Sequence, residues 1–112
     1  MRVCITGVAG FIGANMAQHH LNLGDEVYGL DDLSAKHSPH LQQLQQHPQF
    51  KLICGDLSTW TDYQSVLPGT DLIYHFAAVV GVFNVLKHPE LVLNNNIVPS
   101  MHLLKAIVQY SP

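Results

Sequence analysis

A glycine-rich turn near the amino terminus constrains the fold of this chain more than any other feature. A short apolar run at residues 3–5 leads directly into Thr6-Gly7-Val8-Ala9-Gly10-Phe11-Ile12-Gly13. Residues 11–23 then carry apolar side chains at helical spacing, and Gly24 supplies a stop. A buried strand, a glycine turn and a helix in this order are the setting in which such a motif binds the pyrophosphate of a dinucleotide. The sequence therefore predicts a strand, a ligand-binding turn and a helix at its start.

Each glycine of this turn has a separate expected role. We expect Gly7 to allow the sharp turn off the strand, and Gly10 to let backbone N–H groups approach a pyrophosphate without a Cβ in the way. Gly13 would let the helix pack closely on the sheet. Asp31 lies 18 residues after Gly13, near the distance at which a carboxylate accepts hydrogen bonds from an adenosine ribose. The alternative is a glycine turn that joins a strand to a helix and binds nothing.

Strands and helices are expected to alternate along the rest of the chain. The predicted strands after the first cover residues 27–30, 50–54 and 71–76, and the predicted helices lie around residues 41–44, at 59–67 and from 89 towards 110. This alternation predicts a parallel sheet with right-handed crossovers. The third strand would lie beyond the second, followed by the first and the fourth. We therefore expect an α/β fold, the N-terminal half of a doubly wound parallel sheet, in a single partial domain over residues 1–112.

Composition excludes several classes of protein. Charged residues make up 12% of the 112 residues and hydrophobic residues 47%, which argues against disorder. The net charge of −3 offers no basic field for nucleic acid. The longest near-continuous apolar run, residues 76–83, is much shorter than the roughly 20 residues of a membrane span.

The two cysteines indicate a reducing compartment. Cys4 and Cys54 would lie two strands apart, about 9–10 Å. A disulfide needs Cα atoms within about 7 Å, so we expect two free thiols in the core and a cytoplasmic protein.

Further motifs carry a resemblance to a known family. The glycines follow the spacing Gly-x-x-Gly-x-x-Gly, and the later motifs are Leu30-Asp31-Asp32-Leu33-Ser34, Gly55-Asp56-Leu57, Ile73-Tyr74-His75-Phe76-Ala77-Ala78, Val79-Val80-Gly81-Val82, His88-Pro89 and Asn96-Ile97. With these motifs the chain resembles the extended short-chain dehydrogenase/reductases, and among them the NAD-dependent epimerases and dehydratases of nucleotide sugars. The resemblance covers the whole chain but only about the first third of such an enzyme. It implies an NAD(P)-binding Rossmann fold with NAD as the cofactor.

The resemblance also assigns cofactor contacts residue by residue. Phe11 and Ile12 would bind the pyrophosphate through their backbone N–H groups, and Asp31 would bind the adenosine ribose. The same end of the cofactor would be wrapped by Asp32, Leu33, Ser34 and Lys36. The acid at Asp31, with Asp32 beside it, would repel the 2′-phosphate of NADP, so we expect NAD to be preferred.

The remaining implied contacts lie later in the chain. Asp56 and Leu57 would border the adenine, and Asn96 would face the nicotinamide half. The segment that passes beneath the cofactor would comprise Phe76, Ala77 and Ala78, continued by Val79 and Val80.

Several of these residues also have simpler explanations. Asp56 after a glycine is a common turn cap, and Ala77-Ala78 is compatible with ordinary tight packing. Asn96 is one residue of a polar run that would suit a solvated helix face, and Lys36 suits a solvated loop.

The catalytic pair of the resembling family is missing from this sequence. That family uses a Tyr followed four residues later by a Lys to move a proton while the nicotinamide moves a hydride. The residues four positions after Tyr28, Tyr63 and Tyr74 are Asp32, Leu67 and Ala78, and Tyr110 is followed only by Ser111 and Pro112. We therefore predict no catalytic residue and no turnover by these 112 residues, with a nucleotide-sugar substrate only in a longer protein. The alternatives are a catalytically inactive nucleotide-binding or interaction module and a truncated fragment without function.

The long C-terminal helix carries two further expectations. Pro99 removes a helical hydrogen bond and costs about 3 kcal/mol, which predicts a kink near Asn95 or a helix that restarts at Pro99. Apolar residues cover more than one face of this helix, and the fourth strand would have an open edge. In the resembling family this helix commonly lies at a dimer interface, so a homodimer through the C-terminal helix is expected.

The histidines do not form a metal-ligand pattern. His37 and His40 lie in a polar loop with no third ligand at metal spacing, so no metal site is predicted.

Overall fold

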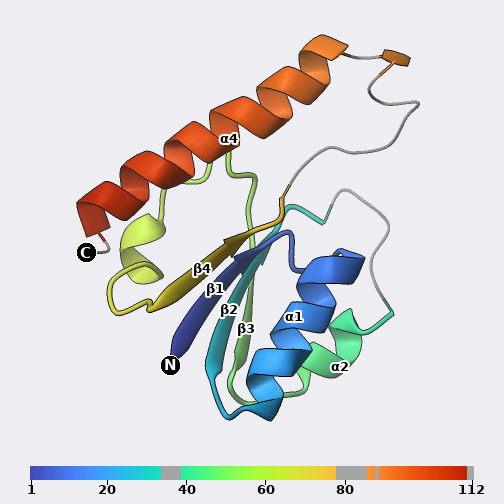
Figure 1. Cartoon of the computed structure of the whole chain (residues 1–112), viewed down its shortest axis with the longest axis vertical. Helices are drawn as coiled ribbons and strands as arrows, with labels where there is room; N and C mark the ends of the chain where they lie inside the picture. The colour runs from blue at the N-terminus through green and yellow to red at the C-terminus, as the bar shows by residue number, and fades with distance from the viewer. Residues whose placement is uncertain (34–38, 78–85, 88, 111–112) are drawn as a thin grey trace.

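Four parallel strands form one sheet in the computed structural model, which describes residues 1–33, 39–77, 86–87 and 89–110. The strands are β1 (Arg2–Thr6), β2 (Glu26–Asp31), β3 (Phe50–Cys54) and β4 (Leu72–His75). Their order is β3-β2-β1-β4, and every pair is parallel (Figure 1). The predicted parallel sheet and its strand order are confirmed.

Helices cover both faces of this sheet. The helical elements are α1 (Phe11–Asn22), α2 (Leu41–Gln45), the short 3-10 turn η1 (Tyr63–Ser65) and α4 (Pro89–Tyr110). Figure 1 shows α1 and α2 on one side of the sheet, and α4 with η1 on the other. Helices on both sides of a parallel sheet make this chain half of a doubly wound α/β fold.

Two hydrophobic cores follow from the alternation of side chains along the strands. Val3 and Ile5 of β1 pack with Ala14 of α1 in the first core. Cys4, between them, points to the opposite face and packs in the second core with Leu103 of α4. Because both faces are covered, the inner strands read as continuous apolar runs, as parallel strands do.

The predicted helix at residues 59–67 is wrong in extent. Only η1 is helical there, and polar side chains on either side bond to the local backbone instead. The Asp56 carboxylate accepts from the Ser58 N–H at 2.9 Å, and the Ser65 hydroxyl donates to the Asp62 carbonyl at 2.9 Å. Such local bonds compete with helical hydrogen bonding and favour turns.

The expectation that both cysteines lie in the core is correct for only one of them. Both are free thiols, but Cys54 is exposed because it is the last residue of the edge strand β3. Cys4 lies in the middle of β1, and burial raises the pKa of its thiol to about 12.

The helix α4 does not restart at Pro99. It runs without interruption from Pro89 to Tyr110 with the proline inside it (Figure 1). Leu103 and Ala106, one and two turns later, are 3% and 5% exposed in the second core. Their packing anchors the helix and offsets the roughly 3 kcal/mol that an interior proline costs.

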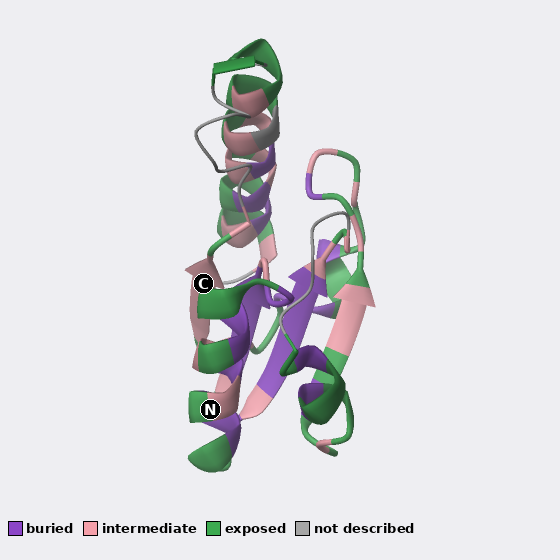
Figure 2. Cartoon of the chain, turned by 90° about the vertical axis from the view of Figure 1, so that its right-hand side faces the viewer, coloured by how far each residue is buried: buried purple, intermediate pink, exposed green. Residues whose placement is uncertain are grey.

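Much of α4 remains exposed, whereas the inner strands are buried (Figure 2). Its large exposed apolar side chains are Leu91, Leu93, Ile97, Met101, Leu104 and Val108. In the part of the chain that the structure describes, no helix combines the length and apolar character needed to cross a bilayer.

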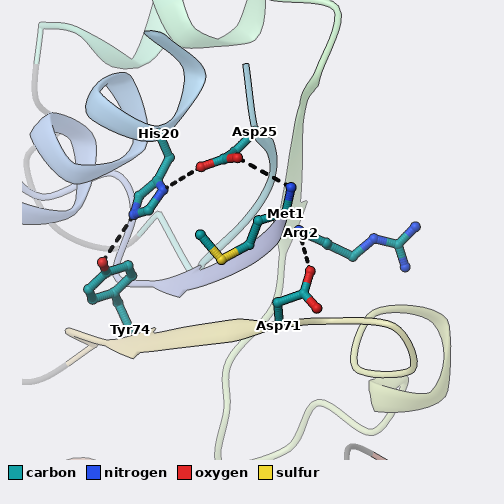
Figure 3. A network of polar contacts seen from close by, with 6 residues as sticks. All are labelled: Met1, Arg2, His20, Asp25, Asp71 and Tyr74. Carbon is teal, nitrogen blue, oxygen red and sulfur yellow. Dashed lines mark hydrogen bonds and ion pairs between the residues drawn. The ribbon is translucent and has the colours of Figure 1, made fainter. Parts of the chain in front are cut away.

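The amino ends of the strands are joined by a polar network (Figure 3). His20, 4% exposed, lies with Nδ1 2.8 Å from Asp25 Oδ2 and Nε2 3.0 Å from the Tyr74 hydroxyl. Asp25 also accepts from the Met1 α-amino group at 3.3 Å. The hydrogen bond from His20 is the largest cause that holds the pKa of Asp25 below its usual range. The network ties the end of α1 to β1 and β4.

Candidate dinucleotide site

The glycine turn lies at the carboxyl end of the sheet, between the ends of β2 and β4. The Gly7 N–H donates to the Leu30 carbonyl at 2.7 Å, and the Phe76 N–H donates to the Thr6 carbonyl at 3.1 Å. The chain leaves β1 towards α1 on one face, whereas α4 packs on the other. In open α/β sheets, ligands bind at this kind of switch point, outside the carboxyl ends of the strands.

Two of the three glycines are required by the protein itself. Gly7 has φ +72°, and a Cβ there would lie 2.8 Å from the Ala77 nitrogen and from the Phe76 carbonyl carbon. A Cβ on Gly13 would collide with the Gly7 carbonyl oxygen. The sequence predicts that Gly13 serves close packing on the sheet, and the structure shows that the tight contact is with the turn instead.

Gly10 is not explained in this way. Its backbone is extended, with φ −76° and ψ 171°, a conformation open to any residue. A Cβ at this position would lie 3.4 Å from the Gly7 carbonyl oxygen, an ordinary contact. Gly10 is exposed and is the N-cap residue of α1, so its missing side chain leaves space at the start of that helix. There the N–H groups of Phe11 and Ile12 are in the first turn, where the helix supplies them with no acceptor.

Asp31 holds the glycine turn in place. Its Oδ2 accepts from the Ala9 N–H at 2.9 Å, and its Oδ1 accepts from the Leu33 N–H at 2.8 Å. Leu33 has φ +60°, a strained conformation for a bulky residue, which this second bond supports. A carboxylate has about four acceptor positions, so each oxygen can also accept from a ligand. The sequence does not single out Ala9, because nothing in its residue type signals a backbone contact.

Asp56 and Leu57 lie on the next strand end. The Gly55 N–H donates to the Asp31 carbonyl at 3.0 Å, so this segment adjoins Asp31. The Asp56 carboxylate is exposed and accepts from the Ser58 hydroxyl at 2.7 Å, which lowers the pKa of Asp56. The turn-capping explanation of Asp56 therefore describes its present contacts. Leu57 packs its side chain into the second core.

Phe76 and Ala77 pass directly beneath Gly7. The Ala77 N–H donates to the Thr6 hydroxyl at 3.1 Å, and the ring of Phe76 stacks on Tyr74 with centroids 5.6 Å apart. Asn96 lies on α4, partly buried, one turn before Ser100, whose hydroxyl donates to the Asn96 carbonyl at 2.7 Å.

The structure brings most of the predicted residues to one end of the sheet. The turn, Asp31, the Gly55–Leu57 segment and Phe76-Ala77 follow the carboxyl ends of β1, β2, β3 and β4. Asp32 and Leu33 follow Asp31 directly. Five predicted contacts lie outside the described residues, namely Ser34, Lys36, Ala78, Val79 and Val80.

The opposite end of the sheet carries a shallow depression. It is lined by Met1, Arg2, Gly24, Glu26, Gln49, Gly69 and Asp71. It lies at the amino ends of the strands, away from the switch point. Over the described ranges, no three His, Cys, Asp or Glu side chains gather as a metal-binding group.

Comparison with known proteins gives the same assignment for fold and motif. The family described as GDP-mannose 4,6 dehydratase matches residues 4–111. The UDP-glucose 4-epimerase of Mycolicibacterium smegmatis is 31% identical over 108 residues, which are 95% of this chain and 34% of that protein. The dTDP-glucose 4,6-dehydratase of the same organism is 31% identical over 99% of this chain and 34% of its own length.

Solved structures agree with these relatives. The dTDP-glucose 4,6-dehydratase DesIV of Streptomyces venezuelae, solved with NAD and TYD bound, superposes with a TM-score of 0.85 at 29% identity. That match covers 97% of this chain and 36% of DesIV. The UDP-Glc/GlcNAc 4-epimerase of Campylobacter jejuni superposes with a TM-score of 0.84 at 29% identity, over 96% of this chain and 33% of its own.

These matches have one property in common. The chain spans about a third of the length of the curated relatives that it matches. A family match over nearly the whole chain, together with the glycine turn, the acid at the end of β2 and the parallel sheet, shows that this chain belongs to the GDP-mannose 4,6 dehydratase family.

Proposed function

We propose that this chain binds NAD as the N-terminal part of a nucleotide-sugar epimerase or dehydratase. The observation that carries the proposal is the space at Gly10. Neither backbone conformation nor packing requires a glycine there, yet its missing Cβ leaves the first turn of α1 open to an anion. The NAD-bound structure of DesIV supports this choice of ligand.

The residues around the turn are suited to separate parts of the cofactor. The N–H groups of Phe11 and Ile12, with the positive end of the α1 dipole, would bind the pyrophosphate. Asp31 would accept from the ribose hydroxyls while it keeps the Ala9 N–H in place. The adenine would lie against Asp56 and Leu57.

The rest of the proposed contact surface extends along the crevice. Asp32, Leu33, Ser34 and Lys36 would surround the adenosine end, and Phe76, Ala77, Ala78, Val79 and Val80 would pass beneath the cofactor. Asn96 on α4 would face the nicotinamide half.

The chemistry of the whole enzyme requires residues beyond these. When bound, NAD would accept a hydride from the carbon that bears a sugar hydroxyl, while the hydroxyl loses its proton to a base, and would return the hydride later. This chain binds and orients the cofactor, and it contributes no Tyr-x-x-x-Lys pair for proton transfer. The nucleotide sugar would be bound only in a longer protein.

Calorimetric titration with NAD and NADP tests the proposal. We expect NAD to bind more tightly, because Asp31 and Asp32 repel a 2′-phosphate and the only arginine in the chain is Arg2. Asp31→Ala should weaken NAD binding by roughly 1–3 kcal/mol, the scale of hydrogen bonds to a charged group. Asp62→Ala, which removes an exposed carboxylate beside η1, is the matched control and should leave binding unchanged. Tighter binding of NADP by the unmodified chain would contradict the proposal.

A catalytically inactive nucleotide-binding module is the second candidate. These 112 residues supply nucleotide-binding features and no Tyr-x-x-x-Lys pair, which suits either candidate. Both candidates predict NAD binding without NADH oxidation by these 112 residues, and they differ in whether the reading frame continues beyond Pro112 into a Ser or Thr and a Tyr-x-x-x-Lys.

We further propose a homodimer that forms through α4 in a reducing, cytoplasmic setting. The exposed apolar side chains of α4 and the open edge of β4 support self-association. Two free cysteines suit a reducing compartment. Light scattering should show a dimer or larger species, and a stable monomer would contradict this part of the proposal.

A further inference from the structure

A chain of hydrogen bonds joins the ends of β1 and β4 to α4. The Ala77 N–H donates to the Thr6 hydroxyl at 3.1 Å, and that hydroxyl lies 2.6 Å from His75 Nδ1. His75 Nε2 lies 2.9 Å from the Ser100 hydroxyl, which donates to the Asn96 carbonyl at 2.7 Å. The five residues come from β1, from β4 and the segment that follows it, and from α4.

The groups at the two ends of this series of hydrogen bonds, the Ala77 N–H and the Asn96 carbonyl, fix the direction of every bond between them. A backbone N–H only donates, so Thr6 must accept from Ala77. A carbonyl only accepts, so the single proton of the Ser100 hydroxyl is used on Asn96. Ser100 must then accept from His75, which places a proton on Nε2. A neutral imidazole carries one N–H, so Nδ1 is the acceptor and takes the proton of Thr6.

Any other protonation of His75 leaves a group unsatisfied. With the proton on Nδ1, Thr6 would accept twice and its own proton would need another acceptor, although Thr6 is 0% exposed. Ser100 would also have to turn away from Asn96 to donate to Nε2. A doubly protonated ring has the same conflict at Thr6.

The surroundings of His75 favour the neutral ring. The groups that face it from β1 and α4 are two uncharged hydroxyls, those of Thr6 and Ser100. Burial holds the pKa of His75 below its usual range, and no charged group among the described residues contributes to that shift. The hydrogen-bond geometry requires a neutral His75 with its proton on Nε2, and burial also favours the neutral ring.

We propose that His75 is a positioning residue beside the glycine turn. Neutral and protonated on Nε2, it accepts a hydrogen bond from Thr6 and donates one to Ser100. This bridge fixes α4 and the Phe76-Ala77 segment against the end of β1. This positioning role goes beyond the cofactor contacts named above. It rests on the proposed function only in those experiments that measure NAD affinity. The backbone of Ala77 lies close against Gly7, so the bridge also holds in place the segment on which the glycine turn packs.

The proposal predicts the direction of a pH effect. A histidine whose pKa is lower in the folded state stabilises the fold above its ordinary pKa of about 6.5, and this contribution is lost as the pH falls through the lowered value. The bridge should therefore open as the pH falls below about 6.5 and through the lowered pKa, where His75 gains its second proton.

Nitrogen-15 NMR of the imidazoles in the unmodified, ligand-free chain tests the bridge directly. We expect a protonated Nε2 and an unprotonated Nδ1 for His75 at pH 7.5. The Ala77 amide should exchange with solvent about tenfold faster once His75 titrates, because its acceptor Thr6 is then displaced. Two results would overturn the inference whether or not NAD binds: a proton on Nδ1 of His75 at neutral pH, or an exchange rate of the Ala77 amide that does not change as His75 titrates.

Matched variants separate positioning from simple loss of structure. Thr6→Val removes the hydroxyl at nearly constant shape and should weaken NAD binding about 3- to 10-fold, whereas Thr6→Ser should restore it. Opening of the bridge at acid pH should lower the NAD affinity of the wild type. His75→Gln keeps an N–H donor towards Ser100 but does not titrate, so this pH-dependent fall should disappear. His19→Gln, on the exposed side of α1, should keep the wild-type pH profile.

The outcomes for the bridge and for the proposed function are distinguishable. A chain with the expected His75 tautomer and Ala77 coupling that binds no NAD supports the bridge and refutes the proposed function. An NAD affinity with the same pH profile in wild type and His75→Gln refutes the positioning role while leaving NAD binding established.

Discussion

The two ends of the sheet both carry polar groups, but they use them differently. At the amino end, His20, Asp25, Tyr74 and the Met1 amino group satisfy one another (Figure 3). At the carboxyl end, the first turn of α1 presents backbone N–H groups next to the space that Gly10 leaves. At the amino end, groups of the chain itself provide the hydrogen-bond partners. At the carboxyl end, a bound anion would provide the acceptor.

The difference shows how a structural network is told apart from a binding site. A buried polar group costs free energy unless it has a partner, so a network of mutually bonded side chains contributes to stability. A glycine that the fold does not require leaves room for something outside the chain. Substitutions at the amino end should therefore change stability, and those at Gly10 should change binding.

Gly7→Ala should have the largest effect on stability. The substitution puts a side chain into a left-handed conformation and 2.8 Å from the backbone of Phe76 and Ala77. The conformational cost and the clash together predict a loss of roughly 2–5 kcal/mol of unfolding free energy. Urea denaturation followed by circular dichroism measures this loss. Gly24→Ala is the control: it has a similar φ of +85° but no atom within 4 Å, so it should lose less.

His20→Phe should have an intermediate effect on stability and none on binding. The ring is retained, but the Asp25 carboxylate and the Tyr74 hydroxyl lose a partner. Asp25 keeps the Met1 amino group, but the loss of the His20 bonds to Asp25 and Tyr74 should cost about 1–3 kcal/mol in the free energy of unfolding. NAD affinity measured by calorimetry should stay at the wild-type value, and a selective loss of affinity would break the distinction between the two ends.

Gly10→Ala should have the smallest effect on stability and a clear effect on binding. Its Cβ would meet the Gly7 carbonyl oxygen only at 3.4 Å, so the unfolding free energy should change by about 0.5 kcal/mol at most. The same methyl group would occupy the space for the pyrophosphate and weaken NAD binding by about 1–3 kcal/mol. Equal NAD affinity for wild type and Gly10→Ala would remove the main support for the proposed function.

Much of the architecture could be predicted from the sequence. Apolar runs located all four strands, the first three of them ending in Gly or Asp, and the third matches the predicted residues 50–54 in full. The order β3-β2-β1-β4 followed from the strand order that doubly wound α/β sheets share, together with right-handed crossovers. These features depend on local patterns and on general rules of chain connection, so they did not require knowledge of side-chain contacts.

The errors arose where particular side-chain contacts, or the place of a strand in the sheet, decide the outcome. Pro99 predicted a kink near Asn95 or a helix that restarts at Pro99; the restart does not occur, because α4 continues through Pro99 to Leu103 and Ala106 in the second core. The sequence predicts a helix over residues 59–67, yet only η1 is helical there, and the local bonds of Asp56 with Ser58 and of Ser65 with Asp62 favour turns. Cys54 lies in an apolar run, which predicts burial, but it is exposed because it is the last residue of an edge strand.

The sequence by itself determined the position of the glycine turn, the acid that follows β2 and the parallel sheet that brings them together. Only the tertiary structure showed that Gly13 serves the turn, that Gly10 leaves space, and that His75 bridges three elements. The physical reason is distance along the chain: Thr6 and His75 are 69 residues apart, and Ser100 is another 25 beyond. Local patterning sets the strands, but the register that pairs Thr6 with His75 forms only when β1 and β4 meet.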